Sequence, residues 1–127
     1  MVLRPNDPVS FSQYPSDNQN DDFHVGAYID NVLVGVASYY IEKSERLHYP
    51  KQSRLRGLAV LPDYREQGVG TELIANSLDI VRGTGSSVLW SAAYPDVCGF
   101  FLKMGFIELP EVYQTETGPQ KLVYRKI

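Results

Sequence analysis

The sequence predicts an α/β fold in which helices pack on a mixed sheet. Three observations support this prediction. Three strand-like apolar segments come first, a long segment with helical periodicity follows, and short strand-like segments then flank a second helical segment. This order of elements is typical of a mixed α/β sheet rather than of a helical bundle or a sandwich. The length is that of one domain, and we expect residues 1–127 to form it.

The N-terminal part of the chain predicts an irregular segment followed by a hairpin. Residues 5–22 are poor in aliphatic side chains and rich in Pro, Ser, Asn and Asp, a composition that favours irregular structure. Apolar residues then dominate 23–29 and 32–41. The two runs are separated by Asp30-Asn31, which is typical of a two-residue hairpin turn.

The middle of the chain predicts a loop, a strand and the longest helix. Residues 42–52 are charged and are expected to form the loop. The run at 54–61 is strand-like and is stopped by Pro62. Apolar side chains then recur at helical spacing from Val69 to about Arg82. A glycine-rich turn therefore joins a strand to a helix.

Shorter elements follow this helix. We expect a strand over 87–92, a helix over 96–104, and two strands near 106–114 and 120–126. Gly105 is placed to close the second helix, because glycine is the preferred residue just beyond a helix end. Gly118-Pro119 is the turn signal between the last two strands.

Composition and charge argue against several classes of protein. No apolar run approaches the roughly 20 residues that span a bilayer, and the start of the chain lacks a signal-peptide pattern. One cysteine, Cys98, allows no internal disulfide, so we expect a cytoplasmic protein. The net charge of −3 gives no general attraction for nucleic acid. We expect neither a nucleic-acid nor a membrane partner, and no metal site.

The turn before the long helix is the most informative segment. It carries Arg65, Gly68 and Gly70. The first N–H groups of a helix lack helical partners and the helix dipole is positive there, so a phosphate or pyrophosphate fits. Glycine lets the backbone approach the anion, and arginine adds charge-assisted hydrogen bonds. The alternative is an ordinary connection that needs glycine for its turn. The pattern is neither a Walker A loop nor a complete dinucleotide fingerprint.

Two stretches of the chain carry a family resemblance. The first comprises Leu58, Ala59, Val60, Pro62, Tyr64, Arg65, Gly68, Gly70, Thr71 and Leu73. The second is Phe100-Phe101-Leu102-Lys103-Met104-Gly105-Phe106, an aromatic pair before a Lys-x-Gly-Phe turn. The first resembles the acyl-CoA signature of the GNAT acetyltransferase superfamily, and the second resembles that family's other signature. The resemblance covers about residues 23–127.

The resemblance implies a GNAT-like fold and a site for acetyl-CoA. The sheet would be mostly antiparallel, and its central parallel strands, about 54–61 and 87–92, would splay apart. The pantetheine would pair with the exposed edge at Leu58, Ala59 and Val60, where an N–H near Ala59 or Val60 would polarise the thioester carbonyl. The residues implied around the pyrophosphate are Arg65, Glu66, Gln67, Gly68, Val69, Gly70 and Thr71.

The resemblance also implies an N-acetyltransferase that moves an acetyl group from acetyl-CoA, as co-substrate, to an amine by direct transfer in a ternary complex. The catalytic pattern departs from the family. Phe101 stands where the usual acid for the thiolate is a tyrosine, and Tyr94 stands where many members have asparagine. We hypothesise that Tyr94 acts near the sulfur as the catalytic acid. The alternative is that Tyr94 is a packing or surface aromatic residue.

Other reactive side chains have simpler explanations, and no carboxylate stands out as a general base. Cys98 is expected to be a small buried apolar group one helical turn before Phe101. Histidines titrate near neutrality, but His24 opens a strand and is expected to be structural. His48 lies in a loop that could border the acceptor site. Trp90 is expected in the core, with a partner for its indole N–H.

The N-terminal region and the missing acid leave alternatives open. Family members usually carry one or two helices over the acceptor side, and residues 5–22, with three prolines, predict a reduced helical region. The acceptor side is then either open or completed by a second subunit in a homodimer. A non-catalytic CoA- or acyl-CoA-binding domain with a degenerate catalytic site is the alternative function. An unrelated α/β interaction domain is a third, and the sequence does not identify the amine.

Overall fold

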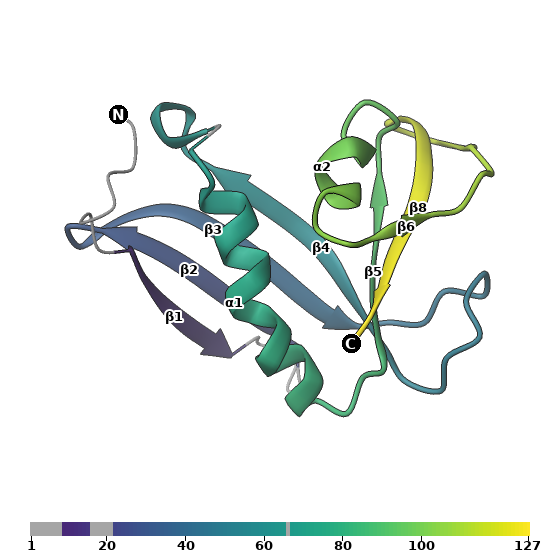
Figure 1. Ribbon diagram of the computed structural model, residues 1–127, viewed down its shortest axis with the longest axis horizontal. Helices are drawn as coiled ribbons and strands as arrows, with labels where there is room; N and C mark the ends of the chain where they lie inside the picture. The colour runs from purple at the N-terminus through teal and green to yellow at the C-terminus, as the bar shows by residue number, and fades with distance from the viewer. Residues whose placement is uncertain (1–8, 16–21, 66) are drawn as a thin grey trace.

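The computed structural model describes residues 9–15, 22–65 and 67–127 (Figure 1). The expectations for Glu66, and for the rest of 5–22, fall outside these ranges. The strands are β1 (Val9–Pro15), β2 (Phe23–Ile29), β3 (Val32–Ile41), β4 (Gln52–Val60), β5 (Val88–Ala93), β6 (Ile107–Glu108), β7 (Tyr113–Thr115) and β8 (Gly118–Lys126). The helices are the 3₁₀ turn η1 (Pro62–Tyr64), α1 (Val69–Gly83) and α2 (Cys98–Leu102).

The described strands form a sheet in the order β1-β2-β3-β4-β5-β8-β6, with β7 paired to β8. The β4–β5 pair is parallel and the other pairs are antiparallel. This arrangement confirms the predicted mixed, mostly antiparallel α/β fold. The hairpin prediction is also confirmed, because Asp30 and Asn31 join β2 to β3 with φ values of 52° and 65°. Two successive positive φ values define the turn that matches the twist of the strands.

Two predictions for irregular structure were wrong or misplaced. Residues 9–15 form β1, which pairs with β2, although the composition of 5–22 predicted an irregular segment. The segment alternates in period two, with Val9 and Phe11 packed against the core, and burial of that face outweighs the polar composition. In the last hairpin the turn lies at residues 116–117, and Gly118 already opens β8.

Helix α1 covers one face of β2, β3 and β4 (Figure 1). The buried residues of α1 are Val69, Leu73, Ile74, Ser77, Leu78 and Val81, at the spacing of one helical face. The helix comes close to the sheet at Gly35, where an added Cβ would lie 3.0 Å from Leu73 and 3.1 Å from Val69. The other helices of the described residues are η1 and α2, and α2 packs against β6 and β8. The opposite face of β2–β4 therefore carries no helix in the described part of the chain.

Candidate functional site

The central parallel pair of strands separates soon after it begins. Residues Gln52–Arg54 of β4 pair with Val88–Trp90 of β5, and the two strands then diverge (Figure 1). The predicted splayed pair is therefore confirmed. Within the described residues no strand covers this edge of β4 beyond Arg54, so its main-chain groups face an opening between the strands.

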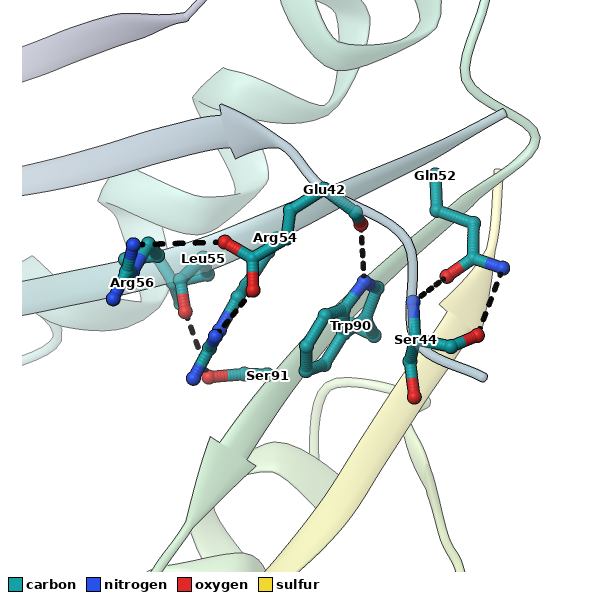
Figure 2. A network of polar contacts seen from close by, with 8 residues as sticks. All are labelled: Glu42, Ser44, Gln52, Arg54, Leu55, Arg56, Trp90 and Ser91. Atoms are coloured by element: carbon teal, nitrogen blue, oxygen red, sulfur yellow. Dashed lines mark hydrogen bonds and ion pairs between the residues drawn. The ribbon is translucent and has the colours of Figure 1, made fainter. Parts of the chain in front are cut away.

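Side chains hold the strands together up to the point of separation (Figure 2). The Glu42 carboxylate accepts a hydrogen bond from Arg54 Nη1 at 2.6 Å, and its main-chain oxygen accepts one from Trp90 Nε1 at 2.8 Å. The Arg54 guanidinium lies over the Trp90 ring, 4.6 Å from its centroid. Ser91 Oγ donates to the Leu55 carbonyl oxygen at 2.9 Å. These contacts fix the start of the opening, and they confirm that the buried Trp90 indole has a partner.

The main-chain groups of Leu58 and Val60 point into the opening. Beyond the end of β4, the Leu61 N–H donates to the Val34 carbonyl of β3 at 2.9 Å. Hydrogen-bonded pairs alternate along an antiparallel ladder, so Val60 and Leu58 turn their N–H and C=O groups away from β3, and Ala59 turns its groups toward it. Arg65 Nε, which donates to the Val60 carbonyl at 3.1 Å from outside the sheet, agrees with this orientation.

A cleft of about 340 Å³ lies where the strands separate. Its lining comes from β4, β5, the connection from β5 to α2, α2 itself and the start of β8, namely Leu55, Arg56, Gly57, Leu58, Ser91, Ala92, Ala93, Tyr94, Val97, Phe100, Phe101 and Gln120. Leu58 lies on the α1 side of the sheet, beside Gly70, whereas Arg56 lies over the Tyr40 ring. The lining therefore includes residues from both faces of β4.

The start of α1 has the geometry expected for binding an anion. Gly68 adopts the left-handed conformation, with φ at 86°, and no side chain of the described residues caps the helix. The first helical bond runs from the Glu72 N–H to the Gly68 carbonyl at 2.9 Å, so the N–H groups before Glu72 have no acceptor within the helix. An added Cβ at Gly68 would meet nothing within 4 Å. The position next to Gly68 is thus open space at the positive end of a helix.

The remaining residues of this segment support the turn. Gln67 Nε2 donates to the Asp63 carbonyl at 2.8 Å, and its Oε1 is buried with no hydrogen-bond partner among the described residues. The Arg65 bond to Val60 uses one of its five N–H donors. Thr71 is exposed on the first turn of α1. The structure thus brings the predicted residues from Arg65 to Thr71 together at one helix start, except Glu66, which lies outside the described ranges.

The two aromatic residues of the catalytic hypothesis line the same cleft. Phe101 is buried in α2, and Tyr94 is 40% exposed just after β5. The cleft therefore presents a phenol at position 94 and none at position 101. Cys98 is buried, as expected, with Sγ 3.5 Å from the Tyr94 carbonyl oxygen, and burial together with the Glu108 side chain raises the pKa of its thiol.

The two histidines occupy different places. His48 is exposed and lines a separate hollow formed by the 43–52 loop, so it does not border the cleft. His24 lies on the sheet face opposite α1, with Nδ1 2.7 Å from Ser38 Oγ.

In the described residues no group of three His, Cys, Asp or Glu side chains could hold a metal ion. None of the described helices is both long and apolar enough to cross a membrane.

Three residues that line the cleft were not singled out from the sequence, namely Arg56, Gly57 and Ser91. Arg56 is the extra residue of a β-bulge between Leu55 and Gly57, opposite the break between Ser38 and Tyr39. A lone glycine within a strand is a known sign of a bulge, so Gly57 was the available signal. Ser91, a polar residue in a short apolar strand, was the signal for the bond to Leu55.

The sequence model of the Acetyltransferase (GNAT) family matches residues 2–106. This match covers more than half of the chain, and the protein therefore belongs to the GNAT acetyltransferase family. It is 31% identical over 112 residues to the uncharacterized N-acetyltransferase YitI of Bacillus subtilis (strain 168), and the alignment covers 88% of this chain and 75% of YitI.

Solved structures show the same fold. The IAA acetyltransferase of Bacillus cereus ATCC 14579 superposes with a TM-score of 0.72 at 14% identity, covering 94% of this chain and 100% of that one. A GNAT family acetyltransferase of Elizabethkingia anophelis, solved with acetyl-CoA bound, gives a TM-score of 0.71 at 13% identity, covering 94% and 98%. At these identities the likeness establishes the fold of the present chain.

Proposed function

We propose that this protein transfers an acetyl group from acetyl-CoA to an amine by direct attack in a ternary complex. The observation that carries the proposal is the exposed edge of β4. Its main-chain groups at Leu58 and Val60 face a cleft, and the open helix start at Gly68 lies on the α1 side of the same strand. An extended chain with a pyrophosphate at one end fits this combination.

The described residues fit such a co-substrate. The pantetheine would take the place of an added strand along Leu58, Ala59 and Val60, with hydrogen bonds to the groups that face the opening. The pyrophosphate would accept from the N–H groups between Gln67 and Thr71, where no Cβ stands in the way at Gly68.

The chain would promote the reaction mainly by holding the reactants. Orientation of two reactants corresponds to effective molarities of about 10⁵–10⁸ M, which exceeds what one acid or base supplies. The N–H groups of Leu58 and Val60 are placed to stabilise charge on the thioester oxygen. Of the two residues expected to supply this N–H, Val60 is kept and Ala59 is replaced by Leu58, because the main-chain groups of Ala59 face β3. Tyr94 would protonate the leaving thiolate.

One observation favours a second function. Phe101 is buried at the position where the family's usual acid is a tyrosine, and it has no proton to give. A domain that binds acyl-CoA without turnover would tolerate this residue. Release of free thiol in the presence of an amine separates the two functions, and Tyr94→Phe tests the replacement acid.

Calorimetric titration with acetyl-CoA tests the site itself. We expect saturable binding by the wild-type protein and no detectable binding by Gly70→Glu, because the new carboxylate would lie at the helix start and repel the pyrophosphate. The added Cβ at position 70 would lie 3.5 Å from the Phe100 ring, an ordinary contact, so the variant should fold. Gly68→Glu should also lose binding, with added backbone strain.

A matched control removes the effect of charge alone. Gly83→Glu adds the same carboxylate to the other end of α1, where an added Cβ meets nothing within 4 Å. This variant should bind acetyl-CoA as the wild type does. Absence of wild-type binding at millimolar acetyl-CoA, or equal affinities for all three glycine variants and the wild type, would contradict the proposed site.

A further inference from the structure

His24 and Ser38 form a polar pair on the sheet face that none of the described helices covers. His24 Nδ1 lies 2.7 Å from Ser38 Oγ, and the two residues are directly opposite in the β2–β3 register. Both side chains are half-buried. Their neighbours along the strands, Val25 and Ala37, are fully buried against α1, so the pair points to the other face.

Gly57 brings Ser38 next to the lining of the cleft. Gly57 lines the cleft and pairs with Ser38 across β3 and β4. An ideal Cβ at Gly57 would lie 3.8 Å from both Cβ and Oγ of Ser38. The absent side chain therefore leaves the Ser38 hydroxyl open to a molecule that lies over Gly57. Leu58, whose N–H faces the opening, is the next residue along the strand.

The side chains that surround His24 on the neighbouring strands are two tyrosines and an arginine. Tyr14 of β1 lies opposite His24, and its hydroxyl bonds to that of Tyr28, which raises the pKa of Tyr28. From β3 the Tyr40 ring approaches edge-on, with centroids 6.4 Å apart. Arg56 of β4 lies over the Tyr40 ring, 5.4 Å from its centroid.

Two carboxylates of the described residues lie near this pair, and both are engaged. Asp22, two residues before His24, accepts a hydrogen bond from the Ile41 N–H with Oδ1 at 2.8 Å. Glu42 accepts from Arg54 at 2.6 Å and lies 3.6 Å from Arg56 Nη1. It is thus paired with two guanidinium groups. An imidazole with one bare ring nitrogen can accept a proton, and histidine is the side chain most often used in general-base chemistry.

We infer that Ser38 and His24 relay the proton that the acceptor amine loses when it attacks the thioester. Ser38 Oγ takes a proton from the amine nitrogen as its own proton passes to His24 Nδ1, with the other ring nitrogen, Nε2, already protonated. Loss of this proton turns the bound ammonium into a neutral amine, whose freed lone pair forms the bond to the carbonyl carbon. The carbon–sulfur bond then breaks with its electron pair leaving on sulfur, and the second proton lost by the nitrogen replaces the one that Tyr94 gives to the thiolate. Ser38 ends neutral and His24 ends as imidazolium, which returns its proton to water.

This inference rests on the proposed acetyl transfer, and the test keeps the two apart. Thiol release from acetyl-CoA is followed from pH 6 to 9 with a diamine, an amino-acid amide and a short peptide bearing a free N-terminus. For the best acceptor we expect His24→Gln and Ser38→Ala to lower kcat/KM about 10²-fold at neutral pH, the lower end of a proton-transfer contribution. Ser38→Thr keeps a hydroxyl and should retain most of the rate. The affinity for acetyl-CoA should not change in any of them.

The pH profile distinguishes a relay from a structural bond. The deficit of His24→Gln should shrink as the pH approaches the pKa of the amine, because water then supplies the free amine. His48→Gln, which alters the other histidine away from the cleft, should match the wild type. If the wild type turns over an amine and His24→Gln equals it at every pH, the relay is wrong and the transferase stands. If the wild type binds acetyl-CoA but none of the amines causes it to release thiol, the proposed transferase activity and the relay both fail.

Discussion

The two halves of β4 differ in what satisfies their outer edge. Residues Gln52–Arg54 pair with β5, and the contacts of Glu42, Trp90 and Ser91 hold this half in place. From Leu55 to Val60 the same edge lacks a strand partner among the described residues and borders the cleft. The first half contributes stability and the second half offers hydrogen-bonding groups, and one short strand does both because its partner diverges partway along.

Contacts beside the cleft keep β4 and β5 apart. Separated strands would close to pair their free main-chain groups unless other contacts opposed it. Phe100 and Phe101 of α2 fill the space beside the cleft, and Ser91 satisfies the first unpaired carbonyl, that of Leu55. The site is therefore built by packing that prevents pairing, and changes to the two halves should affect different measurements.

The largest expected effect comes from breaking the paired half. Trp90→Ala removes a buried ring, leaves the Glu42 main-chain oxygen without the indole N–H, and takes away the ring beneath the Arg54 guanidinium. We expect the free energy of unfolding in urea to fall by about 3–5 kcal/mol. Trp90→Phe keeps most of the packing but not the indole N–H, and should cost about 1–3 kcal/mol. Equal losses for the two variants would show that the ring volume, and not the hydrogen bond, holds the strands together.

Tyr39, which lies opposite the point where β4 and β5 separate, makes the free energy of unfolding depend on pH. Tyr39 pairs with Leu55 and stacks on Phe23, and burial raises its pKa to about 12, with the Ser77 hydroxyl offsetting part of the rise. The unfolded chain loses this proton near pH 10, before the folded one. Stability from this group is therefore complete below pH 10 and falls as the pH rises from 10 to 12, by about 2–3 kcal/mol in all.

Tyr39→Phe isolates this contribution from the other tyrosines. The difference in unfolding free energy between wild type and variant should be constant from pH 7 to 9 and should shift in favour of the variant above pH 10. A difference that stays constant up to pH 11 would show that Tyr39 titrates as it does in the unfolded chain.

Much of the fold was predictable because local patterns determine it. The hairpin at Asp30-Asn31, the periodicity of α1 and the closure of α2 by Gly105 are encoded by neighbouring residues. β1 was missed because its polar composition concealed an alternation of only two partly buried positions, Val9 and Phe11. Its strand character depends on β2 being alongside, which is a tertiary condition.

The candidate site was predictable where the glycine-rich segment and the family resemblance mark it, which includes Leu58, Tyr94 and Phe101 in the lining of the cleft. Gly68 and Gly70 identified the helix start, but no local pattern shows that Ser38 lies beside Gly57, or that Ser91 reaches Leu55. Those contacts join strands far apart in sequence and depend on register. Register likewise decides that Val60, and not Ala59, faces the opening, because alternate residues of a strand bond to opposite sides.

The smallest expected effect is the sharpest test of the comparison, because it uses one substitution at adjacent residues. Ala59→Pro deletes an N–H that faces β3 and should lower the free energy of unfolding by about 1–3 kcal/mol. Val60→Pro deletes an N–H that faces the cleft, so the ladder keeps its bonds and the loss should stay below about 1 kcal/mol. The effects on the affinity for acetyl-CoA should come in the reverse order. The Kd of acetyl-CoA should rise about tenfold for Val60→Pro, which is the equivalent of one lost hydrogen bond. It should not change for folded Ala59→Pro. Urea unfolding and calorimetry on the same preparations measure both quantities. If both variants lose stability equally and neither loses affinity, the edge of β4 does not hold the co-substrate, and the cleft serves another purpose.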